Sequence, residues 1–351
     1  MTQKTKMSEG KKNLIYACVL ILLIGITFTL IFSKFDYKET LIVLHQADMR
    51  WIAAAVILNF GFVSFEAWNI GQILRSISAP ASFLRCVKYV LIEIYFNAIT
   101  PSASGGQPMQ IVEMKKDGVP FSTSAITLMV IAIAYKGALL VLMGIMALTG
   151  KWGLISNFGS LKWLFWLGLF LNIASVFLMF IILVFGGIVH QTLVAFFVIL
   201  AHFHIIKDLD YRKKKLEATM RHYREGSAYI LRHRQIFYKV VAFSVLQRIC
   251  RFGVTWIVFR AFGLQGADFM TITLLAAAVS VAADMMPIPG AVGINETCYL
   301  LAFKNIFGNK FLAPSMLLSR TISFYGMVLF CAVFLIVMQF HRLRRGNLDK
   351  N

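Results

Sequence analysis

The chain has 351 residues, of which 59% are hydrophobic and 15% are charged, and its mean hydropathy is +0.74. Soluble globular proteins carry about 25% charged residues, so this composition excludes a large soluble domain. The formal net charge is +19, but the basic residues flank apolar segments, where anionic lipid headgroups attract them. We therefore expect an all-α polytopic membrane protein whose partner is the lipid bilayer, with no nucleic-acid partner.

Cysteines and short motifs give no indication of catalysis. The five cysteines, at positions 18, 86, 250, 298 and 331, are odd in number and form no Cys-x-x-Cys spacing, so they indicate neither a disulfide framework nor a metal site. The motifs of nucleophilic hydrolases, zinc proteases, phosphate-binding loops and dinucleotide folds are missing. We expect no cofactor, no metal and no catalytic residue.

Six apolar stretches are long enough to cross a hydrocarbon core, which takes about 20 helical residues. They comprise residues 13–33, 51–74, 121–150, 163–187, 236–262 and 314–340. The first stretch has no small-residue cleavage site, so we interpret it as a retained span and not as a signal peptide. The predicted organisation is a cytoplasmic N-terminus at 1–12, a transmembrane domain at 13–341 and a cytoplasmic tail at 342–351.

Two further apolar regions are interrupted by proline and glycine. Residues 85–113 are broken at 100–108, and residues 268–307 are broken at 287–293. Because proline removes a backbone donor and glycine loosens a helix, each region should form two half-helices around an irregular turn. Most of these arms are too short to cross a bilayer comfortably.

Charge sets the expected topology. Arg75, Arg85, Lys88, Lys115 and Lys116 surround both ends of the first broken region, so both ends should be cytoplasmic and the region should enter and return without crossing. The second broken region should dip in from the opposite side, with both chain termini cytoplasmic in a plasma membrane of bacterial type. This arrangement has the form of an inverted repeat, and paired interrupted segments mark the substrate site of secondary transporters.

The stretch 188–206 is apolar, yet it contains His190, Gln191, His202 and His204 and leads into a strongly basic segment. As a span it would place this segment outside, against the positive-inside rule. We therefore expect 188–235 to be a cytoplasmic interfacial and basic segment. Its histidines are interpreted as interfacial residues and not as metal ligands.

Charges inside apolar spans are costly and therefore indicate function. Arg248 and Arg251 lie three residues apart on one face of a span, and Arg320 lies near the start of the last span. Together they could line a path for a phosphate headgroup, which arginine grips in bidentate fashion. The alternative is that they pair with Glu296, Asp284 or Glu93 and lock the bundle.

The first break is rich in uncharged polar groups. Glu93 lies four residues before Asn97, and Thr100, Ser102, Ser104 and Gln107 follow. A half-helix starting near Gly106 would aim free N–H groups at the turn and favour an anion. The alternative is that these polar groups only satisfy one another in a bent backbone.

In the second break, Glu296 follows Gly293 at the start of a half-helix, where its carboxylate could bind the anchoring arginines or simply cap local N–H groups. Glu66 and Lys136 lie inside predicted spans, and each could be a gating charge or half of a structural pair.

Two runs carry a family resemblance: NAITPSASGGQP at 97–108 and PIPGAVGINE at 287–296, followed by Arg320 at the start of the last span. They resemble the transmembrane domain of the lysylphosphatidylglycerol synthase/flippase family, which includes the multiple peptide resistance factors, and the resemblance extends from residue 14 to residue 340. One departure is Ala291, where relatives usually carry glycine, which suggests that the turn tolerates a methyl group.

The resemblance implies a membrane domain that moves aminoacylated or other phospholipids between leaflets, while a separate soluble domain transfers lysine from lysyl-tRNA. The sequence ends shortly after its last predicted span, so we expect no lysyltransferase activity. The predicted lipid-binding residues are Glu93, Asn97, Thr100, Ser102, Gly105, Gly106, Gln107, Arg248, Arg251, Pro289, Gly290, Gly293, Glu296 and Arg320.

The leading hypothesis is therefore a flippase-like protein whose partners are anionic or aminoacylated phospholipids. Phosphatidylglycerol lysyltransferase activity, with its associated resistance to cationic peptides, is the enzymatic alternative. A third hypothesis is an accessory subunit for a separately encoded transferase, and a homo-oligomer is also compatible with the sequence.

Overall fold

The computed structural model describes residues 37–185, 232–284 and 286–348, with four isolated positions elsewhere. The described residues form helices and no strand, which confirms the all-α polytopic class. Five of their helical segments are long and apolar enough to cross a membrane: Met49–Ser76, Phe121–Leu148, Lys151–Val184, Arg234–Ala261 and Lys304–Gln339. The predictions for 13–33 and for 188–206 with its histidines lie outside the described residues.

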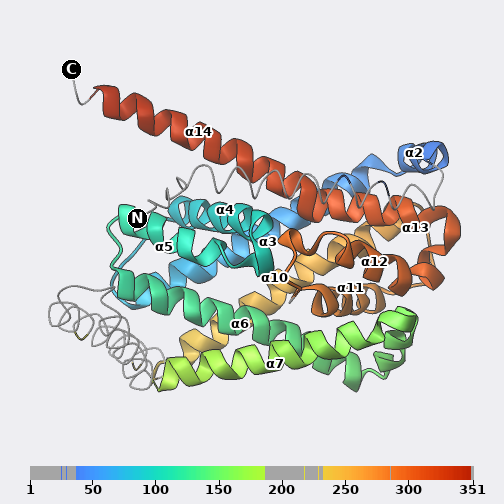
Figure 1. The fold of residues 1–351 in the computed structure, drawn as a ribbon, viewed down its shortest axis with the longest axis horizontal. Coiled ribbons are helices and arrows are strands. Elements are labelled where there is room, and N and C mark those ends of the chain that lie inside the picture. Colours follow the sequence, from blue (N-terminus) through green and yellow to red (C-terminus); the bar gives the residue numbers. More distant parts are fainter. Residues whose placement is uncertain are drawn as a thin grey trace, which may run out of the picture.

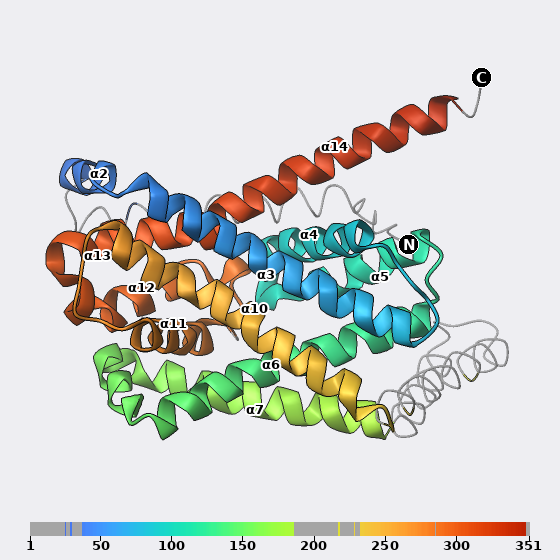
Figure 2. The same cartoon turned by 180° about the vertical axis from the view of Figure 1, so that it is seen from behind.

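The four middle spans coincide closely with the predicted apolar runs. They are α3 (Met49–Ser76), α6 (Phe121–Leu148), α7 (Lys162–Val184) and α10 (Arg234–Ala261). α3 begins where the Asp48 side chain accepts a hydrogen bond from the backbone N–H of Arg50 at 2.8 Å, as an N-cap residue does. α3 and α10 lie side by side across one face of the molecule (Figure 2).

The last span starts earlier than predicted. α13 (Lys304–Arg320) contains Pro314 in its interior, so the proline does not begin the helix as the predicted range 314–340 implied. A π-helical turn over Thr321–Tyr325 then separates α13 from α14 (Gly326–Leu348). π-helical turns interrupt helices most often at functional sites. Here the turn directly follows Arg320.

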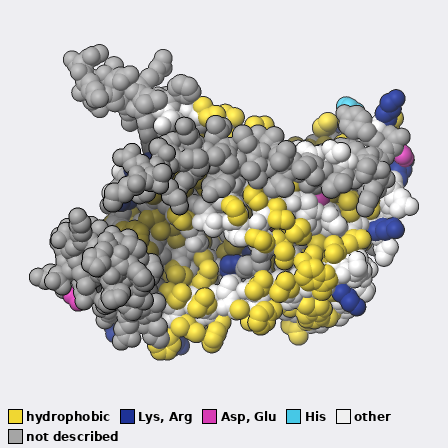
Figure 3. Space-filling model, viewed as in Figure 1, with side chains coloured by type: hydrophobic (Ala, Val, Ile, Leu, Met, Phe, Trp, Pro, Cys, Tyr) yellow, Lys and Arg dark blue, Asp and Glu magenta, His cyan; other side chains and the backbone are white. Residues whose placement is uncertain are grey.

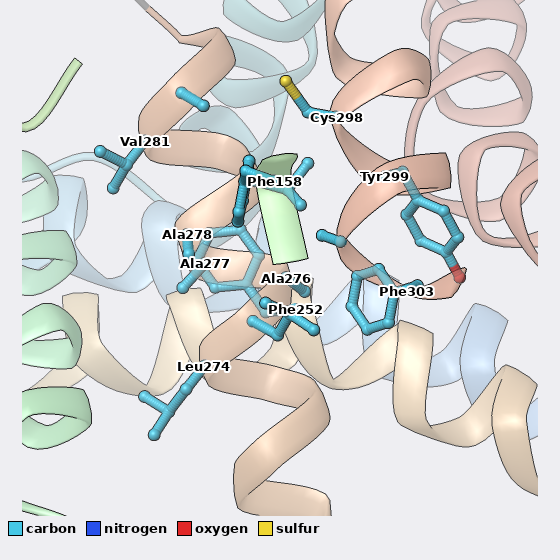
Figure 4. Packing of buried hydrophobic residues seen from close by; sticks show 14 of the residues in the cluster. Phe158, Phe252, Leu274, Ala276, Ala277, Ala278, Val281, Cys298, Tyr299 and Phe303 are labelled. Carbon is cyan, nitrogen blue, oxygen red and sulfur yellow. The ribbon is translucent and has the colours of Figure 1, made fainter. Parts of the chain in front are cut away.

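Two short helical elements were not predicted. α2 (Tyr37–His45) precedes α3 and packs against α13. The loop between α6 and α7 is a 3₁₀-helical segment, η2 (Lys151–Leu161). Its Phe158 is fully buried and lies between the two helices of the second broken region (Figure 4). The buried apolar side chains of η2 are therefore part of the hydrophobic core.

The first broken region forms a helical hairpin. α4 (Phe83–Ile99) and α5 (Gly106–Lys116) pack against each other around the short 3₁₀ turn η1 (Pro101–Ala103). At the open end, Lys88 lies 3.0 Å from Glu113 and 2.6 Å from Asp117. These ion pairs place the beginning of α4 beside the end of α5, so the chain turns back on itself within the region.

The second broken region forms a hairpin that opens in the opposite direction. α11 (Phe269–Ala283) and α12 (Ile294–Ala302) flank the 3₁₀ turn η3 (Pro289–Ala291). Lys151 lies 3.3 Å from Asp268, so this hairpin opens beside the end of α6. The first hairpin opens beside the start of α6, which begins shortly after Asp117. The two hairpins therefore enter the bundle from opposite ends.

The turns of the two hairpins meet inside the bundle. Each turn begins with proline and continues with two residues in the left-handed conformation. Ser102 and Ala103 have φ of 52° and 51°, and Gly290 and Ala291 have φ of 59° and 50°. This shared Pro-x-Ala turn is a local structural repeat that hydropathy alone did not reveal.

Large apolar side chains cover the outside of the bundle. On α7, Trp163, Phe170 and Phe177 are among the exposed residues, and Figure 3 shows apolar surface over this helix. Soluble monomers rarely expose such continuous apolar area, and a hydrocarbon environment explains it. α6 and α7 run side by side along this part of the molecule (Figure 1).

Candidate functional site

A cavity of about 460 Å³ lies where the two hairpin turns meet. Residues of α3, α4, α6, α10, α11, both turns and the π-helical turn contribute to its wall. Ligand pockets commonly have volumes of about 300–1,000 Å³, so the cavity has the size of a small ligand or a lipid headgroup. Its acidic and basic lining residues are Glu66, Glu93, Lys136, Arg248, Arg251, Asp284 and Arg320.

Arg248 is held firmly in the wall. Its side chain is buried, and its Nε donates to the backbone carbonyl of Tyr135 at 3.2 Å. The guanidinium lies 3.5 Å from the centre of the Tyr135 ring, which stabilises the charge through a cation–π interaction. Its carboxylate neighbour, Asp284, is 3.9 Å away. Part of the Arg248 charge is therefore compensated by an aromatic face instead of a close ion pair.

Arg251 has weaker anchors. Its guanidinium lies 5.0 Å from the Phe62 ring centre and donates to the side-chain oxygen of Asn59 at 3.4 Å. Among the described residues, no carboxylate lies within ion-pair distance of it. As predicted, both arginines of α10 face the same space, and Arg251 is the one with the more available charge.

Arg320 is locked in an ion pair, which is the alternative that the sequence left open. Its Nε donates to Glu296 at 2.6 Å, and both side chains are buried. The same carboxylate also accepts from the Tyr325 hydroxyl at 2.8 Å and from the backbone N–H of Gly293 at 2.7 Å. Glu296 thus ties the start of α12 to the π-helical turn and also caps its own helix.

Two carboxyl groups lie together on another part of the wall. Glu66 of α3 accepts from the Gln247 amide at 2.8 Å, and Glu93 of α4 accepts from the Asn97 amide at 3.3 Å. Among the described residues, neither glutamate forms an ion pair with a cation. Lys136 lines the same cavity. The site therefore presents acidic groups as well as cations.

The first turn is held together by its own polar groups. The Thr100 hydroxyl accepts from Gly105 N–H at 2.9 Å, and the Asn97 oxygen accepts from Gly106 N–H at 3.0 Å. These first N–H groups of α5 are therefore not free to face a ligand, which corrects the expectation from sequence. The Ser104 hydroxyl likewise donates to the Pro101 carbonyl at 2.9 Å.

The predicted residues separate into a lining group and a supporting group. The lining group contains Glu93, Asn97, Ser102, Gln107, Arg248, Arg251, Gly290 and Arg320. The supporting group, which contributes no wall, contains Thr100, Gly105, Gly106, Pro289, Gly293 and Glu296. Its glycines allow close packing, because a Cβ on Gly106 would lie 2.3 Å from the Asn97 oxygen.

Sequence reasoning missed the aromatic part of the wall. Tyr135 and Phe252 flank Arg248, and Phe324 packs so closely on the second turn that a Cβ on Gly290 would lie 2.2 Å from its ring. In a chain with 14% aromatic residues, no composition or spacing distinguishes these rings from ordinary core residues. Of these rings, only Tyr135 could have drawn attention, because it precedes the intramembrane Lys136 in the sequence.

An apolar helical bundle with helices long enough to cross a membrane, which encloses a charged cavity between two broken helical hairpins, defines a polytopic membrane protein. Residues 14–331 match the family described as the lysylphosphatidylglycerol synthase TM region. The chain belongs to this family.

The chain is also similar to the UPF0104 membrane protein PH1989 of Pyrococcus horikoshii. The two are 24% identical over 318 residues, which cover 87% of this chain and 92% of that protein. The similarity thus extends over most of both chains.

Proposed function

We propose that this protein binds the headgroup of a phospholipid in the central cavity and moves it between the two leaflets. The observation that carries the proposal is the meeting of both hairpin turns at a cavity whose wall holds Arg248 and Arg251. A headgroup needs a polar path through hydrocarbon, while its acyl chains stay in the lipid. The two hairpins enter the bundle from opposite ends and bring their turns together at this cavity.

The charges of the wall favour a phosphate-bearing headgroup. A guanidinium binds phosphate oxygens in a bidentate, charge-assisted fashion, and Arg251 has only an amide oxygen and an aromatic ring as its closest partners. Glu66 and Glu93 could accept hydrogen bonds from an amino or hydroxyl group on the same headgroup. Anionic or aminoacylated phospholipids therefore suit the site. Arg320 serves chiefly to hold the second turn in place.

The orientation that we propose has the open end of the first hairpin in the cytoplasm. Arg75, Arg85, Lys88 and Lys116 gather near this end, which follows from their places on α3, α4 and α5. By the positive-inside rule, we propose that both termini lie in the cytoplasm, and that the membrane is a plasma membrane of bacterial type. Modification of single introduced cysteines in intact cells tests this orientation, and labelling of positions 88 and 116 from outside would contradict it.

Reconstitution into liposomes tests translocation directly. Purified protein is inserted into vesicles that carry a fluorescent phosphatidylglycerol, and the fraction of label that becomes accessible to a membrane-impermeant quencher is followed with time. We expect faster exchange than in protein-free vesicles. Arg251→Gln should lower the rate by about tenfold or more, because loss of one charge-assisted contact to phosphate removes about 1.5–3 kcal/mol.

Arg260→Gln is the matched control. Arg260 lies on the same helix but faces Trp51 and the carbonyl of Leu264, away from the cavity. It should exchange lipid at the wild-type rate. Equal rates for wild type and Arg251→Gln, or no acceleration over empty vesicles with well-folded protein, would reject the proposed function.

The proposal assigns no chemical step to the chain. Lipid extracts of cells that express it, with and without a supply of lysyl-tRNA, test this point. Aminoacylated lipid formed by the purified chain alone would favour the lysyltransferase alternative. Co-purification of a separate transferase in stoichiometric amount would favour an accessory role instead.

A further inference from the structure

Glu66 and Glu93 form a carboxyl pair that the lipid-binding role of the arginines does not explain. Glu66 is 6% exposed, and both side chains line the cavity. They come from different helices, α3 and α4, and within the part of the chain that the structure describes neither forms an ion pair with a cation. Two buried carboxyl groups without a cationic partner are stabilised when one of them carries a proton, because an unpaired charge is costly to hold away from water.

The surroundings of the pair fix it in place without neutralising it. Gln247 of α10 donates to Glu66, and Asn97 of α4 donates to Glu93. Both are uncharged amides. The other ionisable groups that line the cavity with the pair are Arg248 and Arg251 of α10, Tyr135 and Lys136 of α6, Asp284 after α11, Tyr299 of α12 and Arg320 of α13.

The nearest other acidic group on the first hairpin is already engaged. Glu113 of α5 pairs with Lys88 and Lys116 at the open end, and Arg320 is paired with Glu296. The charge of the cavity is thus decided by the remaining groups. Three cations, Lys136, Arg248 and Arg251, stand against Asp284 and the Glu66–Glu93 pair.

We propose that the Glu66–Glu93 pair is a binding site for one exchangeable proton, and that this proton is carried together with an anionic headgroup. With the proton bound, the three cations exceed the two remaining negative charges and the cavity attracts an anion. When the proton leaves, the charges balance and the anion is released more easily. Proton and anion therefore bind cooperatively, each raising the affinity for the other. The inference rests on the proposed function, because it names the ion that couples to it.

The proton is taken from water on one side of the membrane and returned to water on the other side. No other reactant is needed. A proton gradient would then bias the direction of headgroup movement, and the anionic phosphate and the proton would cross as a neutral pair. Neutral pairing lowers the cost of moving a charge through a low-dielectric interior.

The test is the affinity for phosphatidylglycerol of the detergent-solubilised protein as a function of pH, with phosphatidylcholine as reference. Affinity for phosphatidylglycerol should fall as pH rises, approaching about tenfold per pH unit once the pair has lost its proton, as linkage of one proton to one anion requires. The double variant Glu66→Gln/Glu93→Gln cannot take up or lose the proton, so its affinity should not change over the same range. Asp268→Asn, which changes an exposed carboxylate outside the cavity lining, should follow wild type.

A wild-type affinity that is independent of pH would overturn the inference, and so would a pH dependence that persists in the double variant. An affinity that depends on sodium but not on pH would assign the pair to a sodium ion and overturn it as well. Glutamine matches a protonated carboxyl in size, and a monodisperse elution profile checks that the variant is folded.

A second measurement separates this inference from the proposed function. Infrared spectroscopy of the lipid-free protein at neutral pH should show the C=O band of a protonated carboxylic acid, and the double variant should lack it. If phosphatidylglycerol does not bind at any pH, the proposed function fails, while the band still decides the proton site. Absence of the band in wild type would reject the proton site even if lipid translocation is observed.

Discussion

Replacing Glu296 by glutamine is expected to destabilise the protein by about 3–5 kcal/mol, the cost of removing one partner of a buried ion pair. Glu296 is 1% exposed and Arg320 is 8% exposed, so water does not compensate the charge that remains. The glutamine oxygen can still accept hydrogen bonds, but the amide nitrogen that replaces the other oxygen cannot. Either the Gly293 N–H or the Arg320 and Tyr325 donors therefore lose their acceptor. The Phe324 ring, 4.4 Å from the guanidinium, stabilises the cation only in part.

A double variant measures the interaction energy of the Glu296–Arg320 ion pair separately from the cost of replacing either side chain. Arg320→Gln alone leaves a buried carboxylate, which still has the Tyr325 hydroxyl and the Gly293 N–H as donors. Glu296→Gln/Arg320→Gln removes both charges and leaves two amides that can bond to each other. The double variant should therefore lose less free energy of unfolding than the two single variants together, by about 2 kcal/mol or more, because neither charge is left unpaired.

The assay is unfolding of the detergent-solubilised protein in the presence of a thiol-reactive fluorogenic dye. Cys86, Cys250, Cys298 and Cys331 are buried, so the dye reports loss of tertiary structure. Free energies of unfolding follow from titration with sodium dodecyl sulfate at constant temperature. The reasoning is wrong if Glu296→Gln lies within about 1 kcal/mol of wild type, or if the two single costs simply add in the double variant.

Three further expectations use the same assay. Gly168→Ala should cost about 1–3 kcal/mol by overpacking, because its Cβ would lie 1.9 Å from a backbone oxygen of α11, whereas Gly144→Ala, with no atom within 4 Å, should cost nothing. Ala291→Gly should raise stability by about 0.5–1 kcal/mol, because glycine relieves the strain of a positive φ; a loss would refute the assigned conformation. Partial burial raises the pKa of Asp117, but hydrogen bonds from Lys88 and Tyr89 have a larger opposite effect, so the pKa of Asp117 is lowered overall. The extra stability of wild type over Asp117→Asn should thus be constant above about pH 5 and shrink as pH falls below about 4; a difference that grows in acid would contradict this.

The sequence was sufficient for the elements that depend on local composition. An apolar run of some 20 residues in a chain with few charges can only be a buried or lipid-facing helix, which is why α3, α6, α7 and α10 begin and end within a few residues of their predicted bounds. The two hairpins were predictable from local sequence as well, because several proline and glycine residues gather near the middle of each apolar region and together interrupt its helix.

Boundaries that depend on packing were not predictable. Pro314 lies inside α13, where the proline and its neighbours Ala313 and Ser315 are buried in the bundle. Likewise, the segment of η2 is short and mildly apolar, and its helical form is secured by Phe158, which inserts between α11 and α12. Such contacts join residues more than a hundred positions apart, which leaves no trace in a local pattern.

By itself, the sequence determined that intramembrane charges would be rare, that they would cluster near two broken helices and that the chain would be a helical membrane protein. Tertiary structure alone decided which charges pair and which remain available. Arg320 and Arg251 look equivalent in the sequence, yet one is held by Glu296 and the other by an amide oxygen. The reason is physical: an ion pair depends on distances of a few ångströms between helices, and only the packing of those helices sets them.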